Sequence, residues 1–452
     1  MLYKVKKERL FTNQQLLALL WPLIIEQALG VLVGMADTVM VSSVGEAAIS
    51  GVSLVDMINM LINAIFAAVA TGGAVIASQY IGRGDHKSAS LAAKQLFYAS
   101  LALSAVLGVI AVFFRKPVLN MVFGSIEADV MAHAQIYFLL SAISYPFLAV
   151  YNAGAALFRS MGDSRTTMLI SILMNTINIV GNAILIYGFQ MAAAGAAAAS
   201  LVSRAVGAII ITVLLLNPRR IIFYDKLHKP EIHLSMLKSI LQIGVPNGLE
   251  NSIFQIGKIL VASIVSGFGT ISITANAVAG NLASLQVIPG MALGMAMITV
   301  VGQCIGAKDY EAVKKYTKKL MLITYGVVWA MTLLMLLFSK QILSFYSLSE
   351  ETTTMTMEVF IVHGICAVIV WPLAFALPNA LRAANDVRFT MIVSLLSMWI
   401  FRIGFSYVLA IYFNMGILGT WIAMCIDWFC RGACFVIRFA RGKWKNISFI
   451  DN

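Results

Sequence analysis

Charged side chains are scarce in this sequence of 452 residues: Asp, Glu, Lys and Arg together make up 12% of it, and hydrophobic residues make up 60%. Soluble globular proteins contain about 25% charged residues. A chain so poor in charge lacks the polar surface that a water-soluble protein of this size requires. Its composition therefore excludes the soluble class and places the chain among membrane proteins.

Signatures of enzymes and of ATP-driven transport are also missing. The sequence contains no glycine-rich phosphate-binding loop, no H-E-x-x-H zinc motif and no paired-aspartate motif of a membrane prenyltransferase. There are only five cysteines, which lie in or beside apolar segments, and none has metal-ligand spacing with histidine. We therefore expect neither an enzyme nor a bound cofactor, and any transport must draw on an ion gradient.

Long apolar segments recur along the whole chain, and each is long enough to cross about 30 Å of hydrocarbon. The sequence predicts an all-α, polytopic membrane protein with twelve transmembrane helices. The predicted spans are 14–42, 50–81, 95–114, 131–158, 166–188, 192–216, 236–266, 271–305, 320–338, 355–380, 390–413 and 416–440. The first apolar run is too long for a cleaved signal peptide.

Lysine and arginine gather in segments that fall on one side of the membrane if both termini are cytoplasmic. The largest groups lie in 219–238, in 308–319 and in the tail after 431. Basic residues concentrate in cytoplasmic loops, so this bias predicts a multi-pass protein of the cell membrane with both termini in the cytoplasm. It also explains the net charge of +12 without a nucleic-acid partner.

The second half of the chain repeats the first. The aligned pairs, displaced by 224 residues, include Pro22 and Pro246, Glu26 and Glu250, Gly45 and Gly269, Gln79 and Gln303, and Asp85 and Asp309. Further on, "RSMGDSRTTM" (159–168) aligns with "RAANDVRFTM" (382–391). The repeat predicts two pseudo-symmetric six-helix bundles, residues 1–216 and 240–452, joined by a cytoplasmic linker, 217–239. Because six is even, both bundles run in the same sense, as in secondary transporters.

The first span carries two carboxylates, Glu26 and Asp37. They are eleven residues apart, which places them on one helix face about 16 Å apart along the axis. A carboxylate within a span costs at least ~2.5 kcal/mol and usually faces a cavity or a partner. Pro22 lacks an N–H group and can kink the helix below Glu26. The segment therefore combines titratable groups with a hinge, which is a plausible arrangement for a switch.

A scaffolding role competes with a coupling role for these acids. Glu26 and its repeat partner Glu250 can each bind a neighbouring helix end, and this duty would explain why both halves keep a glutamate. Asp37 has Val261 at the corresponding place in the second half. Shared architecture therefore explains Asp37 less easily than it explains the two glutamates.

Polar residues within other spans are further candidates. Asn178 and Asn182 lie one turn apart in the fifth span, and their amides suit either coordination of a hard cation or hydrogen bonding between helices. In the second half, Lys258 follows Glu250 by two turns but lies about 80° round the helix, which leaves a direct pair open. Asp386 ends a predicted cytoplasmic turn, and both a loop role and a transport role are open for it.

The segments "LWPLIIEQALGVLVGMADTVMVSSVGEAAISGVS" and "SQYIGRGD" resemble the start of a multidrug and toxic compound extrusion (MATE) transporter. The segments "GVPNGLE", "GQCIGAKD" and "GTWIAMCIDW" resemble its second half, so the resemblance covers nearly the whole chain. It implies two six-helix bundles in a V around a central cavity that opens alternately to either side. It also implies export of cationic amphipathic compounds in exchange for H⁺ or Na⁺.

The resemblance extends to individual residues. Asp37 corresponds to the family's first-helix aspartate, implicated in proton or cation coupling, and Pro22 to the proline at which that helix bends. Asn178 corresponds to the asparagine of the family's N-lobe cation site. Asn182 stands where many members have a second aspartate, and Ser200 stands where they have a threonine. The resemblance thus implies ion coupling at Asp37, Asn178, Asn182 and Ser200, with Asp37 and Asn178 as ligands if the ion is Na⁺.

Glu250 and Asp386 form an alternative coupling site in the second half. Asp386 aligns with an aspartate that some Na⁺-coupled members use, but their seventh-helix glutamate falls at Phe254 in this sequence. Glu250 lies one turn earlier and is the nearest substitute. A second, tenth-helix aspartate of those members is absent, with Val370 near its place, so the pattern favours the first half.

Two other functions compete with drug export: a lipid-linked oligosaccharide flippase of the same superfamily, and a passive channel. Such flippases often carry extra helices or several arginines in the cavity. This chain has twelve predicted spans and three basic residues within them, Arg204, Lys258 and Arg402. A channel would not need carboxylates beside a helix hinge. The sequence therefore favours an exporter of small organic cations. We expect it to act as a monomer in the bilayer, although nothing in the sequence determines its oligomeric state.

Overall fold

A computed structural model describes residues 10–124, 127–225, 227, 231–344, 346 and 348–447 of the chain. Within these residues the regular structure is helical throughout, without a β-strand. The α-helices are α1 (Asn13–Ser42), α2 (Glu46–Arg83), α3 (His86–Phe123), α4 (Ala128–Ser160), α5 (Ser164–Asn182), α6 (Ala192–Leu215), α7 (Leu234–Ser266), α8 (Thr270–Gly306), α9 (Tyr310–Leu337), α10 (Ser339–Ser344), α11 (Glu350–Ile369), α12 (Leu377–Ala383), α13 (Val387–Ser397) and α14 (Gly416–Ala440). Short π-helical segments are Ala183–Gly188, Pro372–Ala376, Met398–Gly404 and Tyr407–Tyr412, and a 3₁₀ turn is Lys443–Asn446.

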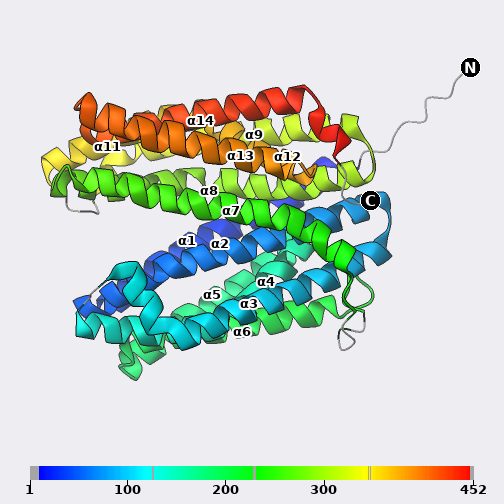
Figure 1. The fold of residues 1–452 in the computed structure, drawn as a ribbon, viewed down its shortest axis with the longest axis horizontal. Coiled ribbons are helices and arrows are strands. Elements are labelled where there is room, and N and C mark those ends of the chain that lie inside the picture. The colour runs from blue at the N-terminus through cyan, green and yellow to red at the C-terminus, as the bar shows by residue number, and fades with distance from the viewer. Residues whose placement is uncertain are drawn as a thin grey trace, which may run out of the picture.

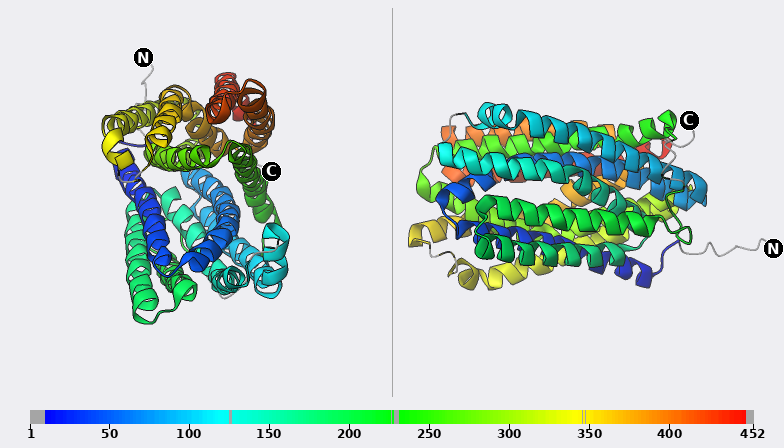
Figure 2. Two further views of the ribbon diagram at one scale, coloured as in Figure 1. Left: turned by 90° about the vertical axis from the view of Figure 1, so that its left-hand side faces the viewer. Right: turned by 90° about the horizontal axis from the view of Figure 1, so that it is seen from below.

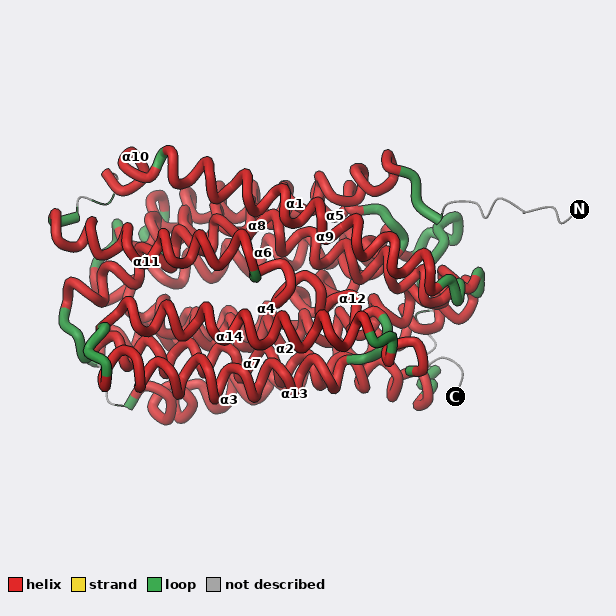
Figure 3. The backbone as a smooth tube through the Cα atoms, turned by 90° about the horizontal axis from the view of Figure 1, so that it is seen from above, coloured by secondary structure: helices red, strands yellow, loops and turns green. Residues whose placement is uncertain are grey.

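Twelve helical segments of the described chain are long and apolar enough to span a membrane, which confirms the predicted number. Helices α1–α6 form one layer and α7–α14 form the other (Figure 1). We call these layers the N-lobe and the C-lobe. The end-on view shows the two lobes as separate groups of helices (Figure 2), and the loops gather at the two ends of the bundle (Figure 3). Helix α7 begins at Leu234, inside the segment predicted as the linker.

The tenth and eleventh spans are less regular than the sequence analysis predicted. In place of one continuous helix over 355–380, α11 ends at Ile369, and a π-helical segment from Pro372 leads into α12. The α-helix ends where Val370 leaves helical geometry, with φ −120° and ψ −28°, and Pro372, which has no N–H group, begins the π-helical segment two residues later. The eleventh span is α-helical only to Ser397 and is then largely π-helical as far as Tyr412.

The internal repeat is visible in the helix caps. Gly45 and Gly269 precede α2 and α8, and both have positive φ angles, +139° and +88°, which favour glycine. Asp85 and Asp309 are the N-caps of α3 and α9, and each accepts a hydrogen bond from the backbone N–H three residues on, at 3.0 and 3.1 Å. These residues are aligned in the sequence because the two members of each pair are the N-caps of corresponding helices in the two lobes.

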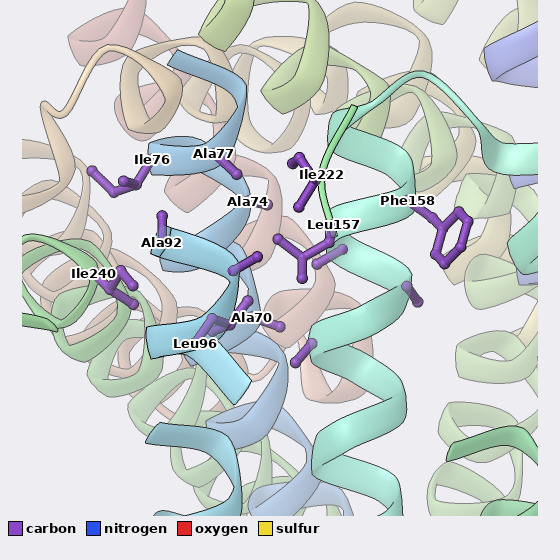
Figure 4. Packing of buried hydrophobic residues seen from close by; sticks show 14 of the residues in the cluster. Ala70, Ala74, Ile76, Ala77, Ala92, Leu96, Leu157, Phe158, Ile222 and Ile240 are labelled. Carbon is purple, nitrogen blue, oxygen red and sulfur yellow. The ribbon is translucent and has the colours of Figure 1, made fainter. Parts of the chain in front are cut away.

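Small residues allow close packing of the N-lobe helices. Ala70 and Ala74 of α2 lie in a buried cluster with Leu96 of α3 and Leu157 of α4 (Figure 4). Ile240 of α7 belongs to the same cluster, so the hydrophobic core continues from the N-lobe into the C-lobe. Small side chains at helix contacts bring backbones together, which is a main source of attraction between helices in a membrane.

The two lobes cross most tightly where α2 and α8 end. A Cβ atom added to Gly82 would overlap the backbone carbonyl of Gln303, and one added to Gly306 would overlap that of Gln79. The four residues form two aligned pairs of the repeat, so the crossing itself is pseudo-symmetric. Glycine is required at both places because the opposing atoms are backbone, which cannot move aside as a side chain can.

Hydrogen bonds between the lobes reinforce this crossing. Gln79 Nε2 donates to the backbone carbonyl of Ala383 in the C-lobe, and Gln303 Nε2 donates to that of Ser160 in the N-lobe, both at 2.8 Å. Thr299 also donates to the carbonyl of Arg159, at 3.0 Å. The end of the bundle at which α2 and α8 finish is therefore closed by polar contacts as well as by packing.

We expect Gly306→Ala to loosen the crossing of α2 and α8. Overpacking of this kind costs about 1–3 kcal/mol, which would raise the population of open states by roughly fivefold to a hundredfold. The measurement is the alkylation rate of Cys304, a fully buried thiol on the same helix, followed by peptide mass spectrometry. The control is Gly326→Ala, because a Cβ atom at Gly326 meets nothing within 4 Å. Unchanged alkylation in Gly306→Ala would show that the crossing does not hold the lobes together.

Candidate functional site

A chain of hydrogen bonds in the N-lobe connects the four residues proposed for ion coupling. Asn182, at the end of α5, donates from Nδ2 to Asp37 Oδ1 of α1 at 2.6 Å and to Asn178 Oδ1 at 3.4 Å. Asn178 donates from Nδ2 to Ser200 Oγ of α6 at 3.0 Å. We call Asp37, Asn182, Asn178 and Ser200 the N-lobe polar chain. The structure thus brings together residues from three helices, as the sequence analysis predicted.

The geometry of α5 explains how two asparagines take part. Asn178 and Asn182 are separated by four residues, so their side chains lie on one face of the helix. Both are buried. The α-helix ends at Asn182 and continues as the π-helical segment Ala183–Gly188 next to the site. Such π-helical segments occur frequently at functional sites.

One oxygen in the N-lobe polar chain has no hydrogen-bond partner among the described residues. Asn182 Oδ1 is buried and accepts no hydrogen bond from the described residues. A buried polar atom without a partner costs about 1–3 kcal/mol. The N-lobe polar chain therefore contains a carboxylate, amide oxygens and a hydroxyl. One of the amide oxygens accepts no hydrogen bond. Oxygen donors of this kind suit a hard cation such as Na⁺, and the carboxylate can also take up a proton.

A second acid of the N-lobe was missed by the sequence analysis. Asp56 of α2 accepts hydrogen bonds from Tyr137 at 3.0 Å and from Asn59 at 3.3 Å. It interacts electrostatically with Asp37, as does Arg204 of α6, whose Nη1 donates to Ser144. Asp56 is a carboxylate within a predicted span, 50–81, which is the same signal that identified Asp37.

Glu26 makes a buried ion pair within the N-lobe. Arg159 Nη1, at the end of α4, lies 3.1 Å from Glu26 Oε1, and Thr167 Oγ1 donates to Oε2 at 2.8 Å. The carboxylate therefore links α1 to α4 and α5. This arrangement supports a structural role for Glu26.

Glu250 makes the equivalent pair within the C-lobe. Arg382 Nη2 of α12 lies 2.8 Å from Glu250 Oε1, and Ser394 of α13 donates to the same oxygen at 2.7 Å. Arg382 aligns with Arg159 in the repeat. Lys258 is therefore not the partner of Glu250, which answers the question that helix geometry alone left open. Glu250 Oε2 has no hydrogen-bond partner among the described residues.

Asp386 lies at a helix boundary, and both of its carboxylate oxygens accept hydrogen bonds. It immediately precedes α13, is buried, and accepts two hydrogen bonds from Arg438, at 2.6 Å from Nε and 3.0 Å from Nη2. Its repeat partner Asp163 precedes α5, caps Thr166 and pairs with Arg220 at 3.2 Å. Asp386 does not share a hydrogen-bonding partner with Glu250 in the described chain. This placement favours the loop role over the transport role.

A cavity of about 420 Å³ lies in the C-lobe and reaches α1 at Gln27 and Val31. Lys258 and Arg402 line it together with aromatic residues, Phe254, Trp371, Phe375, Trp421 and Trp428. Arg402 lies 3.9 Å from the buried carboxylate of Asp427, a second acid that the sequence analysis missed. That carboxylate also binds Arg431, which lies buried inside α14 and was not counted among the basic residues within spans.

Pro22 is buried inside α1, which runs as one α-helix from Asn13 to Ser42. The proline lies one turn before Glu26 on the same helix. A proline removes one backbone hydrogen bond from the interior of a helix. The helix is thus weakened next to the Glu26 ion pair, and the hinge remains a prediction.

Twelve helices that are long and apolar enough to span a membrane, arranged in two lobes, define a polytopic membrane protein. The MatE family model matches the chain twice, over residues 22–184 and 246–408. The two matches are displaced by the same 224 residues as the internal repeat, and together they cover more than half of the sequence. The chain belongs to the MatE family, which confirms the resemblance stated from its motifs.

Relatives align with almost the full length of the chain. An uncharacterized transporter, YisQ, of Bacillus subtilis (strain 168) is 26% identical over 95% of this chain and 94% of its own. A probable multidrug resistance protein, NorM, of Thermotoga maritima is 26% identical over 98% of this chain and 95% of its own. The fold matches that of a multidrug resistance MATE family transporter solved in an outward-facing conformation, with a TM-score of 0.87 at 22% identity, covering 96% of both chains.

Proposed function

We propose that the protein is a secondary active antiporter that exports amphipathic organic cations, including drugs, in exchange for H⁺ or Na⁺. It acts as a monomer in the cell membrane, with both termini in the cytoplasm. The name of the NorM relative, a probable multidrug resistance protein, supports drugs as the substrate class. The coupling ion binds at the N-lobe polar chain and the two lobes alternate in exposing the central cavity.

The hydrogen bond from Asn182 to Asp37 carries this proposal. Asp37 is half-buried, and the Asn182 amide rather than a salt bridge among the described residues holds it in place. A carboxylate that a fixed cation does not neutralise can be neutralised by a proton, by Na⁺ or by a cationic substrate. Competition for one charge is the simplest basis for exchange, because occupancy by one cation then excludes the other.

The contacts between the lobes support alternating access. The crossing at Gly82 and Gly306 closes the end of the bundle that, by the predicted orientation, faces the cytoplasm. A transporter that is closed there takes up its coupling ion from the other side. Loosening of this crossing and closure of the opposite end would then expose the substrate site to the cytoplasm.

Transport in a purified system tests the proposal. The protein is reconstituted into liposomes, and movement of a cationic dye is followed after a H⁺ gradient or a Na⁺ gradient is imposed separately. Uphill movement driven by one of these gradients is the expected result, and the effective gradient identifies the ion. Downhill movement alone would indicate a channel, and no movement under either gradient would contradict the proposal.

Pro22→Ala is expected to slow turnover by about tenfold while dye affinity changes less than twofold. Alanine restores the hydrogen bond that proline removes and stabilises the straight form of the helix by up to about 3 kcal/mol. Part of this free energy adds to the barrier that the helix must cross when it bends. The measurement compares the transport rate with the dissociation constant of the same dye. The control is Pro117→Ala in α3, a proline outside the polar chain. An unchanged transport rate in Pro22→Ala would contradict a hinge at this residue.

A further inference from the structure

The C-lobe cavity has a polarity opposite to that of the N-lobe polar chain. Lys258 of α7 and Arg402 of the eleventh span both line it, and its described lining includes no aspartate or glutamate. The N-lobe places two carboxylates, Asp37 and Asp56, close enough to interact. The molecule therefore has an acidic site in one lobe and a basic cavity in the other.

Lys258 has no anionic partner. No described residue forms an ion pair or hydrogen bond with its ammonium group, and its Nζ atom lies 6.0 Å from the centroid of the Phe254 ring. The side chain reaches the cavity rather than the packed interior. A lysine within a span normally pairs with an acid, contacts carbonyl groups or reaches the interface. Lys258 has no such acid or hydrogen-bonding partner among the described residues.

Arg402 is buried and only partly satisfied. Its residue is 9% exposed, and its Nε and Nη1 atoms have no hydrogen-bond partner. The nearest carboxylate oxygen, Asp427 Oδ2, lies 3.9 Å from Nη1, which is within reach of an ion pair but too far for a hydrogen bond. Arginine stays protonated in proteins, so it cannot lose its charge to escape this environment. A buried donor without a partner points to a missing acceptor.

Asp427 cannot neutralise this cluster because other groups hold it. Arg431 Nη2 lies 3.0 Å from both of its carboxylate oxygens, and Ser397 donates to Oδ1 at 2.5 Å. Phe254 is the common neighbour of the cations: the Cζ atoms of Arg402 and Arg431 lie 5.4 and 5.7 Å from its ring centroid. Three cationic side chains thus surround one ring with a single carboxylate among them, which leaves an excess of two positive charges.

The remainder of the wall is largely apolar, and its largest side chains are aromatic. Trp371, Phe375, Trp421 and Trp428 line the cavity beside the two cations. Its volume of about 420 Å³ falls in the range of small-molecule sites, which are mostly apolar with a few polar groups that fix the ligand's orientation. A ligand that satisfies both parts of this surface needs an acidic head and a flat apolar body.

We propose that the C-lobe cavity is a binding site for an amphipathic organic anion, whose acidic head lies between Lys258 and Arg402 and whose body packs against the aromatic wall. The head is a carboxylate, sulfonate or phosphate, because Arg402 offers unused N–H donors for an anionic oxygen. This site goes beyond the proposed exchange of cations at the N-lobe. It extends the range of compounds that the transporter binds to anions.

Two probes with the same body and opposite charge test the site: 1-pyrenebutyrate and its trimethylammonium counterpart, 4-(1-pyrenyl)butyltrimethylammonium. The full-length protein is placed in phosphatidylcholine nanodiscs, and binding is followed by energy transfer from tryptophan to pyrene. Lys258→Met and Arg402→Gln are each expected to weaken binding of 1-pyrenebutyrate by about tenfold to a hundredfold. Arg402→Lys should retain most of the affinity, and the cationic probe should bind all variants at least as well as the wild type.

Arg165→Gln is the matched control. Arg165 is exposed, outside the cavity, and its neutralisation removes the same charge from the protein. Lys258→Met keeps the proposal testable if Arg402→Gln unfolds, because Lys258 has no partner to lose. The proposal is overturned if Lys258→Met leaves the affinity for 1-pyrenebutyrate unchanged, or if Arg165→Gln weakens it as much as Lys258→Met does.

A second arm identifies the source of the anion. The measurement is repeated in nanodiscs that contain phosphatidylglycerol. If this lipid weakens probe binding to the wild type but not to Lys258→Met, the site accepts an anionic lipid headgroup, and if it has no effect the site selects a soluble anion. Both results support the anion site. Asp37 does not line this cavity, so failure of the proposed ion coupling would leave the anion-binding result unaffected.

Discussion

Asp37→Asn is expected to reduce gradient-driven efflux of a cationic dye to the background of protein-free liposomes. The substitution keeps the shape of the side chain and an oxygen that can accept the hydrogen bond from Asn182, so the fold should be retained. It removes the negative charge for which the ion and the dye compete. Without that charge, binding of one cation no longer depends on release of the other. The measurement is dye movement in liposomes under an imposed gradient, with expression and thermal stability checked on the same preparation.

The matched control is Asp129→Asn, which neutralises an exposed acid in the first turn of α4. Transport by this variant should equal that of the wild type. Wild-type efflux in Asp37→Asn would exclude the N-lobe polar chain as the coupling site. Coupling would then be sought at Glu250, whose Oε2 has no hydrogen-bond partner in the described structure.

The same variant should also change how dye affinity depends on pH. A proton on Asp37 removes the charge that attracts the dye, so affinity in the wild type should fall as pH decreases from about 8 to about 5. In Asp37→Asn the affinity should be lower and nearly independent of pH over this range. The test is equilibrium binding by fluorescence on purified protein with and without Na⁺, since competition by Na⁺ would identify it as a second occupant.

The repeat explains why so much of the architecture could be predicted. Glu26 and Glu250 or Gly82 and Gly306 align because each pair performs the same task in each lobe, and one sequence displays both copies. The alignment also contains Arg159 and Arg382. Their pairing with the glutamates could not be read from the sequence, because the partners lie on different helices more than a hundred residues apart.

Other parts of the sites were missed for different reasons. Asp56 and Asp427 carry the same signal as Asp37, since each is an acid within an apolar span. Both could therefore be predicted from the sequence. The basic character of the C-lobe cavity depends on Lys258 and Arg402 lying beside one ring, that of Phe254, and this proximity arises from the fold. The break before Pro372 could not be predicted from the proline alone, because α1 and α8 continue as α-helices through Pro22 and Pro289.

Glu250→Ala is expected to destabilise the protein by about 3–5 kcal/mol, because it leaves the charge of Arg382 buried without a partner. Glu250→Gln should cost less, about 1–3 kcal/mol, since an amide oxygen can still accept a hydrogen bond from Arg382 or Ser394. The measurement is the thermal unfolding midpoint in one detergent, together with dye transport by the variants that remain folded. A structural role predicts that Glu250→Gln, once folded, transports the dye.

The double variant Glu250→Gln/Arg382→Gln separates the structural role of this pair from a role in coupling. Removal of both charges leaves no buried ion unpaired, so it should recover most of the stability lost in Glu250→Ala. The equivalent change at Glu26 and Arg159 should behave in the same way, because the two ion pairs occupy the same place in the repeat. If the Glu250 variants are stable and yet lose transport while those at Glu26 retain it, the two lobes differ in function at this position, and ion coupling belongs to the C-lobe.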